Sequence, residues 1–484
     1  MLRSKSLFFW SALFAVLLLT YVSVGAQDLV VSDSLVISSD TTFDNVRILD
    51  GGVLIADAQV DVLMNMLIDS GGVVTHSSRH LDGLILNVTD TLVIHSGGMI
   101  DLTAKGLRGG LNGSAFGLDG ETFDSTGAIV AGAGGGQPGG SDGGAGGSYG
   151  GWGATAVGVA TAPYGLLESP SHLGSGGGGY QYEGRRGGNG GGRLRLAAEV
   201  CLVDGVIRAN GGNHDYLGGG GSGGGIRLDV GSLSGAGRIE ANGEEGTDWY
   251  GSLSGAGGGG RIAVYYDNMS VPDTSITAYG HDLGPNSSAG TIYFKDNAES
   301  YGTLIVDNGG VVLQLLSPLL SELTDFKEIT IRHGGGLDVM PDDMPSFTVT
   351  DRVLLHDAAA LELDSGVTMT VSNSSGFDVD VESSSSLVLH NGCQLNANAV
   401  RLGGGILNTS IDLSFPTGSD LEFSNGGTIN VLDSTTFSME FFDPTNIQSG
   451  TLNLTSGSVL DIAADRLEVG TGAVSYTHLR AHET

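Results

Sequence analysis

Three acidic side chains alternate with valines in "DVDVE", where Asp378, Asp380 and Glu382 are two residues apart. In a β-strand this spacing places all three carboxylates on one face. Carboxylate oxygens bind calcium, and neighbouring carboxylates also perform acid/base chemistry on sugars. A solvated acidic ladder beside the "SSSS" that follows is the interpretation we favour. We therefore expect no obligatory cofactor, with calcium at these residues as the alternative.

Aromatic side chains form a second group of candidates, because they gather in glycine-rich segments. Aromatic rings presented on loops stack on sugar rings or anchor protein contacts. The competing interpretation is that they pack the loops against the body of the protein. The candidate binding residues are Tyr149, Trp152, Tyr180, Tyr182, Tyr216, Trp249 and Tyr250. If they bind, replacing Trp152 and Trp249 by alanine should reduce binding and leave the β-sheet circular dichroism intact.

Complete catalytic motifs are absent from the sequence. It contains no H-E-x-x-H, no G-x-S-x-G and no phosphate-binding loop, and "GGSDGG" is too isolated to be a calcium repeat. The loop "GGNHDYLGGGG" and the nearby "YEGRRGG" carry polar residues, but no spacing rule selects them. We therefore expect that the protein is not an enzyme. The alternative is a polysaccharide lyase or glycoside hydrolase, which would need carboxylates from adjacent coils in one groove.

A short repeat supplies the elements that must position these residues. Several segments share an alternating apolar run, a glycine pair and a second apolar run, as in "VRILDGGVLIAD" (46–57) and "LIVDNGGVVLQL" (304–315). Alternation marks strands with one buried face, and Gly-Gly marks the bend between them. Recurrence at about 20 to 35 residues indicates stacked units that bury their apolar faces against one another. The sequence thus favours an all-β fold, a right-handed parallel β-helix, over stacked hairpins or a sandwich.

A longer repeat runs through the glycine-rich middle of the chain. "GGGRLRLAAEVCLVDGVIRANGG" (190–212) returns as "GGGIRLDVGSLSGAGRIEANGEE" (223–245) and loosely as "GGGRIAVYYDNMSVPDTSITAYG" (258–280). Leu194 and its equivalents fall on one face of each strand, and Arg195 and its equivalents on the other. The repeat argues against a disordered linker. We expect the glycine runs to be long loops that leave successive coils at a common corner.

The ordered series "YGLLESPSHLGSGGGG", "GGNGGGRLRLAAEVCLVDGVIRANGG", "GGGGSGGGIRLDVGSLSGAGRIEANG" and "AGTIYFKD" resembles a glycine-rich module of large secreted or surface β-helix proteins from bacterial genomes. The resemblance covers about 84–310. The flanking segments are similar, in a general manner, to autotransporter passengers and adhesins. The resemblance implies a β-helical surface protein that is adhesive or structural, and it brings no catalytic motif.

Composition restricts the partners. The 21 basic and 54 acidic residues give a net charge of −33, which repels nucleic acid. Neutral or cationic partners fit better, such as a glycan or a component of a cell surface or matrix. The two cysteines, Cys201 and Cys393, provide no disulfide framework and lie in apolar runs. We expect both to be small buried hydrophobic residues.

The N-terminal segment 1–26 has the form of a secretory signal peptide. Arg3 and Lys5 precede the apolar run 7–24, and small residues precede a cleavage site after Ala26. A membrane anchor is the alternative, because the apolar run approaches the length of about 20 residues needed to span a bilayer. No later stretch is apolar enough to do so. We expect a secreted or cell-surface location.

The last eleven residues, "VSYTHLRAHET" (474–484), differ abruptly in composition from the rest. They resemble a translated sequencing adapter, so we expect the chain to be a fragment. The expected domains are N-terminal coils (27–105), a glycine-rich module (106–303) and C-terminal coils (304–473). The predicted function is structural or adhesive, with contacts made by loops on a rod. The alternatives are the polysaccharide enzyme above and a non-binding spacer of a larger surface protein.

Overall fold

The computed structural model is an all-β protein. It describes residues 27–111, 119–130, 143–155, 158–180, 184–249, 252–281, 287–311, 315–373, 376–415, 419–439, 450–455 and 458–462. Among these residues the sole helical element is the 3-10 turn η1 (Asp273–Ser275). In the described part of the chain, no helix is long and apolar enough to cross a membrane. The expected signal peptide and the adapter-like tail lie outside the described residues.

The sheet with the most strands has 18 and is here called the long sheet. Its strands pair in parallel except for one antiparallel pair, β21 with β22. The strands are β1 (Leu29–Val31), β3 (Thr41–Phe43), β4 (Val46–Ile48), β6 (Val60–Val62), β7 (Asn65–Ile68), β9 (Leu84–Ile94), β13 (Arg193–Val203), β15 (Gly225–Ser234), β19 (Arg261–Met269), β21 (Thr291–Asp296), β22 (Thr303–Asp307), β24 (Asp325–Arg332), β26 (Ser346–Leu355), β28 (Thr368–Val371), β29 (Val379–Glu382), β31 (Gln394–Asn396), β32 (Ala399–Gly403) and β35 (Asp420–Ser424).

Two seven-stranded parallel sheets accompany the long sheet. The N-terminal sheet contains β2 (Ser34–Ile37), β5 (Val53–Ala56), β8 (Val73–Thr75), β10 (Met99–Asp101), β14 (Val206–Arg208), β16 (Arg238–Glu240) and β20 (Ile276–Thr277). The C-terminal sheet contains β23 (Ser317–Pro318), β25 (Gly336–Val339), β27 (Ala360–Leu363), β30 (Ser386–Leu389), β33 (Ile406–Thr409), β36 (Gly427–Val431) and β38 (Gly450–Leu454). Three small sheets complete the fold: β34 (Leu413–Phe415) with β37 (Thr436–Met439) and β39 (Val459–Ile462), β11 (Thr122–Phe123) with β12 (Ile129–Val130), and β17 (Asp248–Trp249) with β18 (Ser252–Leu253).

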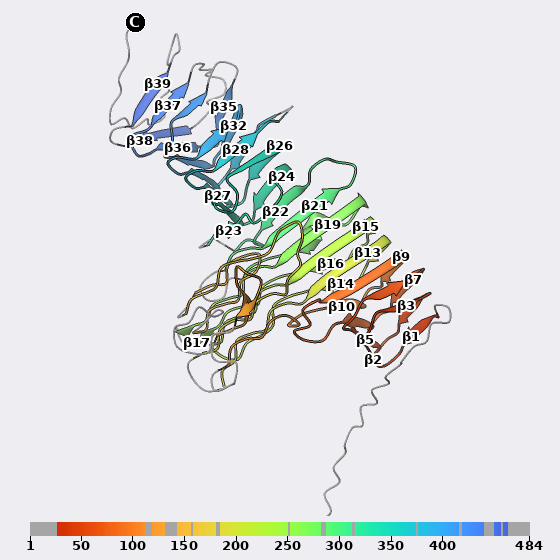
Figure 1. Ribbon diagram of the computed structural model, residues 1–484. Coiled ribbons are helices and arrows are strands. Elements are labelled where there is room, and N and C mark those ends of the chain that lie inside the picture. Colours follow the sequence, from red (N-terminus) through yellow and green to blue (C-terminus); the bar gives the residue numbers. More distant parts are fainter. Residues whose placement is uncertain are drawn as a thin grey trace, which may run out of the picture.

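The chain alternates between the long sheet and a second sheet, and one such passage is here called a rung. The predicted repeat is confirmed as strand, bend, strand: β4 and β5 flank Gly51, whose φ is 76°. Equivalent residues of successive rungs stack in register, as Val46, Met66 and Leu92 do. Figure 1 shows these rungs as one elongated stack. The parallel pairing is compatible with a β-solenoid, and it excludes stacked hairpins for these strands.

The predicted faces of the strands are confirmed by burial. Leu194, Ile226 and Ile262 are in register on β13, β15 and β19 and have no exposed surface. Cys201 and Cys393 are free and buried, as expected of small hydrophobic residues. Burial raises the pKa of the Cys201 thiol to about 12, so this cysteine stays protonated at neutral pH.

The hydrophobic core changes from one face of the long sheet to the other at the pair β21–β22. Ile292 belongs to the cluster of buried residues that includes the N-terminal sheet, while the adjacent Tyr293 belongs to the cluster that includes the C-terminal sheet. On β22, Ile305 joins the first cluster and Leu304 the second. Because neighbours along a strand point to opposite faces, the two cores lie on opposite sides of the sheet. The apolar pattern of the sequence does not show that the chain has two separate cores.

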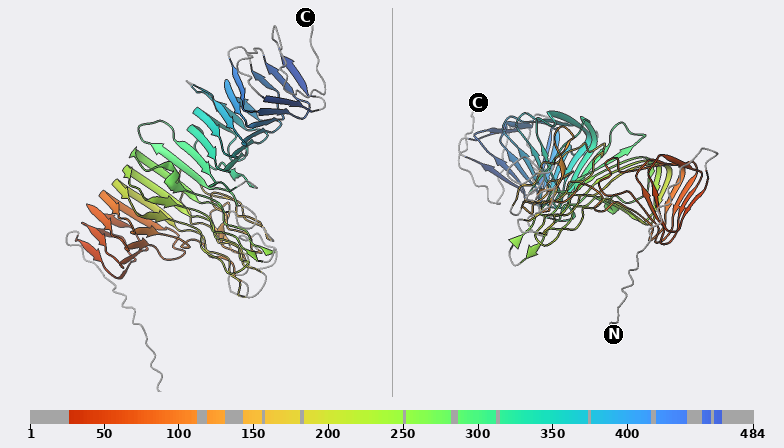
Figure 2. Two further views of the ribbon diagram at one scale, coloured as in Figure 1. Left: turned by 180° about the vertical axis from the view of Figure 1, so that it is seen from behind. Right: turned by 60° about the horizontal axis from the view of Figure 1, so that its bottom comes forward.

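The glycine-rich segments form an ordered lobe beside the stack, here called the glycine lobe. It comprises the described parts of 106–111, 143–155, 173–192, 209–225 and 241–260. Figures 1 and 2 show it projecting from one side of the rungs around β13, β15 and β19. The first three segments belong to one excursion of the chain between β10 of the N-terminal sheet and β13 of the long sheet, whereas 209–225 and 241–260 connect β14 to β15 and β16 to β19. The glycine runs therefore leave at a common corner, as predicted, but they pack together rather than forming open loops.

Backbone hydrogen bonds hold the lobe together with a period of three residues. Along 219–224, successive N–H groups donate to three neighbouring segments in turn, and residues three apart donate to the same segment. The donor–acceptor pairs are Gly219–Gly178 and Ser222–Ser175, Gly220–Gly255 and Gly223–Gly258, and Gly221–Gly212 and Gly224–Ala209. Three residues per turn is the period of a polyproline-II helix. The lobe is thus a bundle of such extended helices that hydrogen-bond to one another.

Side chains have no room in this bundle. A Cβ atom on Gly219 would lie 1.9 Å from the Ala145 carbonyl oxygen, and one on Gly221 would lie 1.9 Å from that of Asn189. Neither glycine has a left-handed φ, so close approach of backbones, not conformational freedom, requires glycine here.

Candidate functional site

The glycine lobe carries an arginine between two tyrosines, here called the tyrosine–arginine patch (Tyr180, Arg185 and Tyr216). The guanidinium carbon of Arg185 lies 4.8 Å from the centre of the Tyr216 ring and 5.7 Å from that of Tyr180. A guanidinium within about 6 Å of an aromatic ring is attracted to it. Tyr216 is nevertheless 55% exposed. The patch therefore presents an aromatic ring to solvent in a fixed position.

Backbone contacts hold Tyr216 in place. Its φ is 46°, in the left-handed region that tyrosine rarely adopts. The Asp215 N–H donates to the Arg186 carbonyl at 2.8 Å, and the Gly218 N–H donates to the Asp215 carbonyl at 3.0 Å, closing the turn. Unfavourable backbone conformations concentrate at binding sites, and Tyr and Arg are enriched at interface hot spots. The turn thus holds the Tyr216 ring at the surface of the glycine lobe.

The other aromatic candidates do not gather in this patch. Tyr149 has no exposed surface and lies inside the protein. Trp152 is half-buried, and its backbone N–H donates to the Ser288 hydroxyl at 2.7 Å. Trp249 lies in β17, but its side chain is outside the described residues, as are Tyr182 and Tyr250. Two of the seven predicted residues, Tyr180 and Tyr216, thus share one site.

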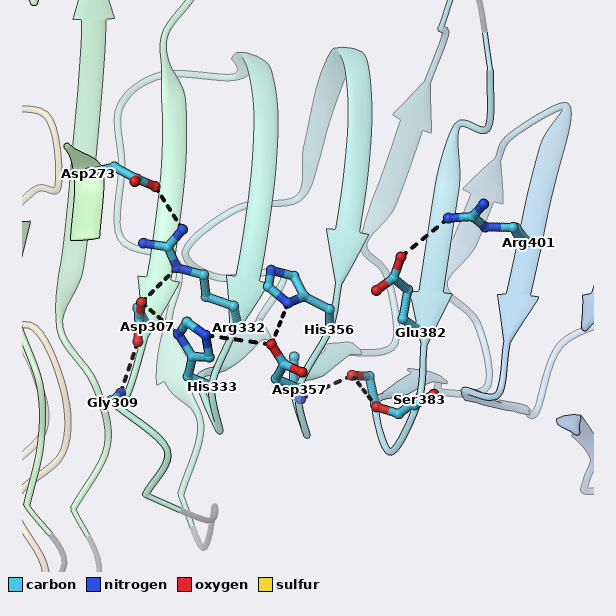
Figure 3. A network of polar contacts seen from close by, with 12 residues as sticks. Asp273, Asp307, Gly309, Arg332, His333, His356, Asp357, Glu382, Ser383 and Arg401 are labelled. Atoms are coloured by element: carbon cyan, nitrogen blue, oxygen red, sulfur yellow. Dashed lines mark hydrogen bonds and ion pairs between the residues drawn. The ribbon is translucent and has the colours of Figure 1, made fainter. Parts of the chain in front are cut away.

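The three predicted metal ligands are engaged by the protein itself. Asp380, 5% exposed, pairs with Arg401 through both carboxylate oxygens, the Nε–Oδ1 distance being 2.8 Å. Glu382 lies 3.3 Å from the same guanidinium, a contact drawn in Figure 3. Asp378 instead accepts the Asn398 N–H. In the described part of the chain, no group of three or more His, Cys, Asp or Glu side chains is arranged to hold a metal ion.

A polar network joins three rungs at the corner that follows β22, β24 and β26 (Figure 3). Arg332 bridges Asp307 at 2.6 Å and Asp273 at 2.7 Å. His333 lies between Asp307, at 3.1 Å, and Asp357, at 3.5 Å. These contacts link one rung to the next, so we assign the network to rung stacking. A His follows the strand in both "ITIRHGG" and "VLLHDA", and this repetition is the sequence feature that indicates the network.

A groove on the outer face of the long sheet went unrecognised in the sequence. It has a volume of about 460 Å³ and crosses β9, β13, β15, β19 and the end of β21. Its floor includes Ala197 and Gly231, whose small size leaves the space open. Three carboxylates from successive rungs line it, namely Glu199, Asp229 and Asp267. The strand register places Glu199, Gly231 and Asp267 in one column. The longer repeat, aligned on its glycine runs, pairs Glu199 with Ser232 instead, so it does not reveal this column.

Contacts with neighbouring residues fix the polar walls of this groove. The Tyr265 hydroxyl donates to the Glu168 carbonyl at 2.8 Å, and the Arg227 guanidinium carbon lies 4.4 Å from the Tyr265 ring. Arg227 also pairs with Asp229 at 2.9 Å. Glu199 is exposed and leans over Gly231, its Oε1 lying 3.0 Å from the position of a Cβ there. An aromatic ring beside carboxylates on neighbouring rungs is an arrangement suited to a sugar.

Comparison with known proteins adds little. No protein-family model matches the chain, and no curated protein matches it. A solved structure that is similar, described as a TibC-catalyzed hyper-glycosylated TibA55-350 fragment, is 10% identical in sequence. The match covers 93% of this chain and 94% of that one, with a TM-score of 0.18. A score this low carries no argument about fold or function.

Proposed function

We propose that this chain is a secreted or cell-surface protein that mediates attachment or matrix contact through a rigid lobe on a rod. The rod is a right-handed parallel β-helix, the hand adopted by nearly all crossovers between parallel strands. The observation that carries the proposal is the tyrosine–arginine patch, where Tyr216 is 55% exposed and has a φ of 46°. Its partner is a glycan or another component of a cell surface or matrix.

The glycine lobe supports this proposal because it removes the usual entropic cost of binding by loops. Ordering a flexible binding loop costs about 0.5–1.5 kcal/mol for each immobilised side chain. Here the segments that present Tyr180 and Tyr216 are already tied to their neighbours, as by the Gly219 N–H, which donates to the Gly178 carbonyl at 2.8 Å. The net charge of −33 disfavours nucleic acid and other strongly anionic partners.

The test is binding of the purified, fluorescently labelled protein to a glycan array and to immobilised matrix proteins. Tyr216→Ala combined with Arg185→Ala should weaken binding tenfold or more, because each interface hot spot contributes about 2 kcal/mol. Tyr301→Ala is the matched control, since Tyr301 is a 39% exposed tyrosine outside the lobe. Unchanged binding by the double variant would refute the assignment to the patch. Failure of the wild type to bind any probe would favour a spacer role.

A second candidate function rests on the groove. Two carboxylates, Glu199 on β13 and Asp267 on β19, flank Gly231 on the intervening strand β15. Strands are about 4.8 Å apart, so the Cα atoms of these two residues are separated by roughly twice that distance, room enough for a sugar between two carboxylates. This arrangement supports a polysaccharide-processing enzyme. Release of new reducing ends from polysaccharides, lost in Glu199→Gln and in Asp267→Asn, would establish it; no release by the wild type would exclude it for the polysaccharides tested.

A further inference from the structure

The long sheet divides into two branches at β26, and one branch ends early. β26 pairs with β28 through its first half and with β29 through its second half. The branch through β29 continues to β32 and β35, whereas the branch through β28 continues only to β31. Among the described strands, β31 pairs with β28 alone, and β34, its equivalent in the next rung, pairs with β37 alone. Two strand edges are therefore left unpaired between neighbouring rungs.

These two edges are too far apart to pair with each other. Most Cα–Cα distances between β31 and β34 exceed 8 Å, whereas paired strands lie about 4.8 Å apart. On the other branch of the same two rungs, β29 and β32 are paired in register. The rungs thus separate on one side only, by more than a single strand spacing.

A groove lies at this opening. It has a volume of about 590 Å³ and is lined by residues 391–396, 410–412, 434 and 435. Two of its apolar side chains, Leu395 and Ile411, are partly buried and pack against the core that includes the C-terminal sheet. Its polar residues Gln394, Asn396 and Asp412 are exposed. The groove therefore combines apolar side chains next to the core with polar side chains at the surface.

The backbone of β31 is free to accept another strand along this groove. The Gln394 N–H donates to the Val367 carbonyl at 2.8 Å, on the side of β28. Consecutive residues of a strand turn their backbone groups to opposite edges, so the N–H and C=O of Leu395 point away from β28. Unpaired backbone groups at a strand edge are a template for pairing with another chain. The groove is therefore suited to an extended polypeptide, whose backbone supplies the matching donors and acceptors.

Charge restricts the occupant further. The described lining residues include one acid, Asp412, and no base, and the whole chain has a net charge of −33. A second copy of this acidic chain would be repelled, whereas a basic segment would be attracted.

We propose that the groove between β31 and β34 binds an extended basic segment of a partner protein, which adds to β31 as a further strand. Apolar side chains of the segment would pack on Leu395 and Ile411, and its basic side chains would lie near Asp412. The groove belongs to the C-terminal rungs and not to the glycine lobe, so this inference is independent of the proposed adhesive function.

The test is selection of seven-residue peptides from a phage-displayed library on the full chain, followed by fluorescence polarisation with the selected peptides. We expect sequences that alternate apolar residues with Lys or Arg. Of two analogues N-methylated at alternate amides, the one that loses the N–H groups facing β31 should bind about tenfold more weakly. Hydrogen exchange at the Leu395 amide should slow when the unmodified peptide binds. Selection of no peptide, equal binding by both analogues and the parent, or unchanged exchange at Leu395 would overturn the proposal.

Two variants locate the binding site. Leu395→Pro removes an N–H that β28 does not use, at an edge position where proline is tolerated, and should weaken peptide binding about tenfold or more. Asp412→Asn keeps an oxygen for the Thr436 N–H, which the Asp412 carboxylate accepts, but removes the charge. It should weaken binding about threefold, as loss of an exposed ion pair does.

Asp33→Asn is the matched control for the charge change. Asp33 is also exposed and accepts a backbone N–H, that of Ser34 at 2.8 Å, but it lies in the first rung. This variant should bind the peptides like the wild type. If Leu395→Pro does not fold, Asp412→Asn and the N-methylated peptides decide, and wild-type affinity in Asp412→Asn counts against the groove.

Discussion

His76 should make the attachment of the glycine lobe sensitive to acid. This residue is fully buried at the end of β8, where its Nδ1 donates to the Ser77 carbonyl at 2.8 Å and its Nε2 accepts the Arg193 N–H at 3.3 Å. The ring is therefore neutral, with its proton on Nδ1. Burial is the main cause that lowers its pKa from 6.5 to about 4, and the nearby His80 and Lys105 lower it further. The Ser77 hydrogen bond and Asp57 oppose this shift.

The sign and size of the effect follow from the two pKa values. A folded-state pKa below the unfolded value means that the unfolded chain binds more protons, so stability is complete above pH 6.5 and falls as the pH approaches 4. At about 1.4 kcal/mol per pH unit, His76 should account for a loss of about 2 kcal/mol at pH 5 and about 3 kcal/mol at pH 4. Protonation would also turn Nε2 into a hydrogen-bond donor, so it could no longer accept the Arg193 N–H.

Hydrogen exchange of the backbone around 190–193 is the direct measurement, with urea unfolding as the global one. Wild type should lose protection at 190–193 as the pH falls from 7.5 to 4.5, after correction for intrinsic exchange. His76→Asn keeps the donor to Ser77 but has no titrating ring, so its pH slope should be flatter by the amount above. His95→Asn, at an exposed histidine, is the control and should keep the wild-type slope. Parallel profiles for wild type and His76→Asn would refute the reasoning.

Three further predictions concern packing and charge. Gly219→Ala should destabilise the lobe by about 1–3 kcal/mol because its Cβ would lie 1.9 Å from a carbonyl oxygen, whereas Gly403→Ala, whose nearest neighbours are at 3.9 Å, should leave the Tm nearly unchanged; equal losses would contradict this. Burial and neighbouring carboxylates raise the pKa of Asp338 to about 6, so its stabilising contribution is complete at low pH and is lost as the pH rises through 6. Asp338→Asn should therefore raise the Tm at pH 7.5 and reduce the gain on acidification; a lower Tm at pH 7.5 would argue against it. Arg401→Met should cost roughly 3 kcal/mol in urea unfolding by leaving Asp380 buried without its cation, and adding Asp380→Leu should recover most of the loss; no recovery would show that the ion pair is not the cause.

Local sequence patterns predicted the rungs well. Leu194 and Ile226 could be assigned to one face because alternation and repeat spacing are properties of neighbouring residues, and the structure buries both. Glycine runs carried less information. The pairing of Gly219 with Gly178 joins two backbones that have no side chains, so no residue pattern distinguishes a packed bundle from an open loop.

The candidate site was harder to predict, because partners distant in sequence decide which aromatic residues are exposed. Tyr149 and Tyr216 occur in similar glycine-rich surroundings. Tyr149 is covered because Arg261 and the segment around Tyr164 meet there, and the Arg261–Tyr164 contact spans 97 residues. Likewise, the sequence "DVDVE" does not reveal that Asp380 forms an ion pair with Arg401 on the next rung. Such contacts depend on register between rungs, which a single sequence specifies only where its repeats align.

The change of core at β21–β22 has a consequence for the sense in which the chain winds. Antiparallel pairing reverses the direction of every later strand in the long sheet, and by itself this would convert a right-handed coil into a left-handed one. The core moves to the opposite face at the same strands, which reverses the hand a second time. Winding before and after the hairpin therefore has one sense, while the axis of the rod steps sideways by one sheet. At this step Ile292 and Tyr293 are covered on opposite faces, so the strand that joins the two halves of the rod is buried on both sides.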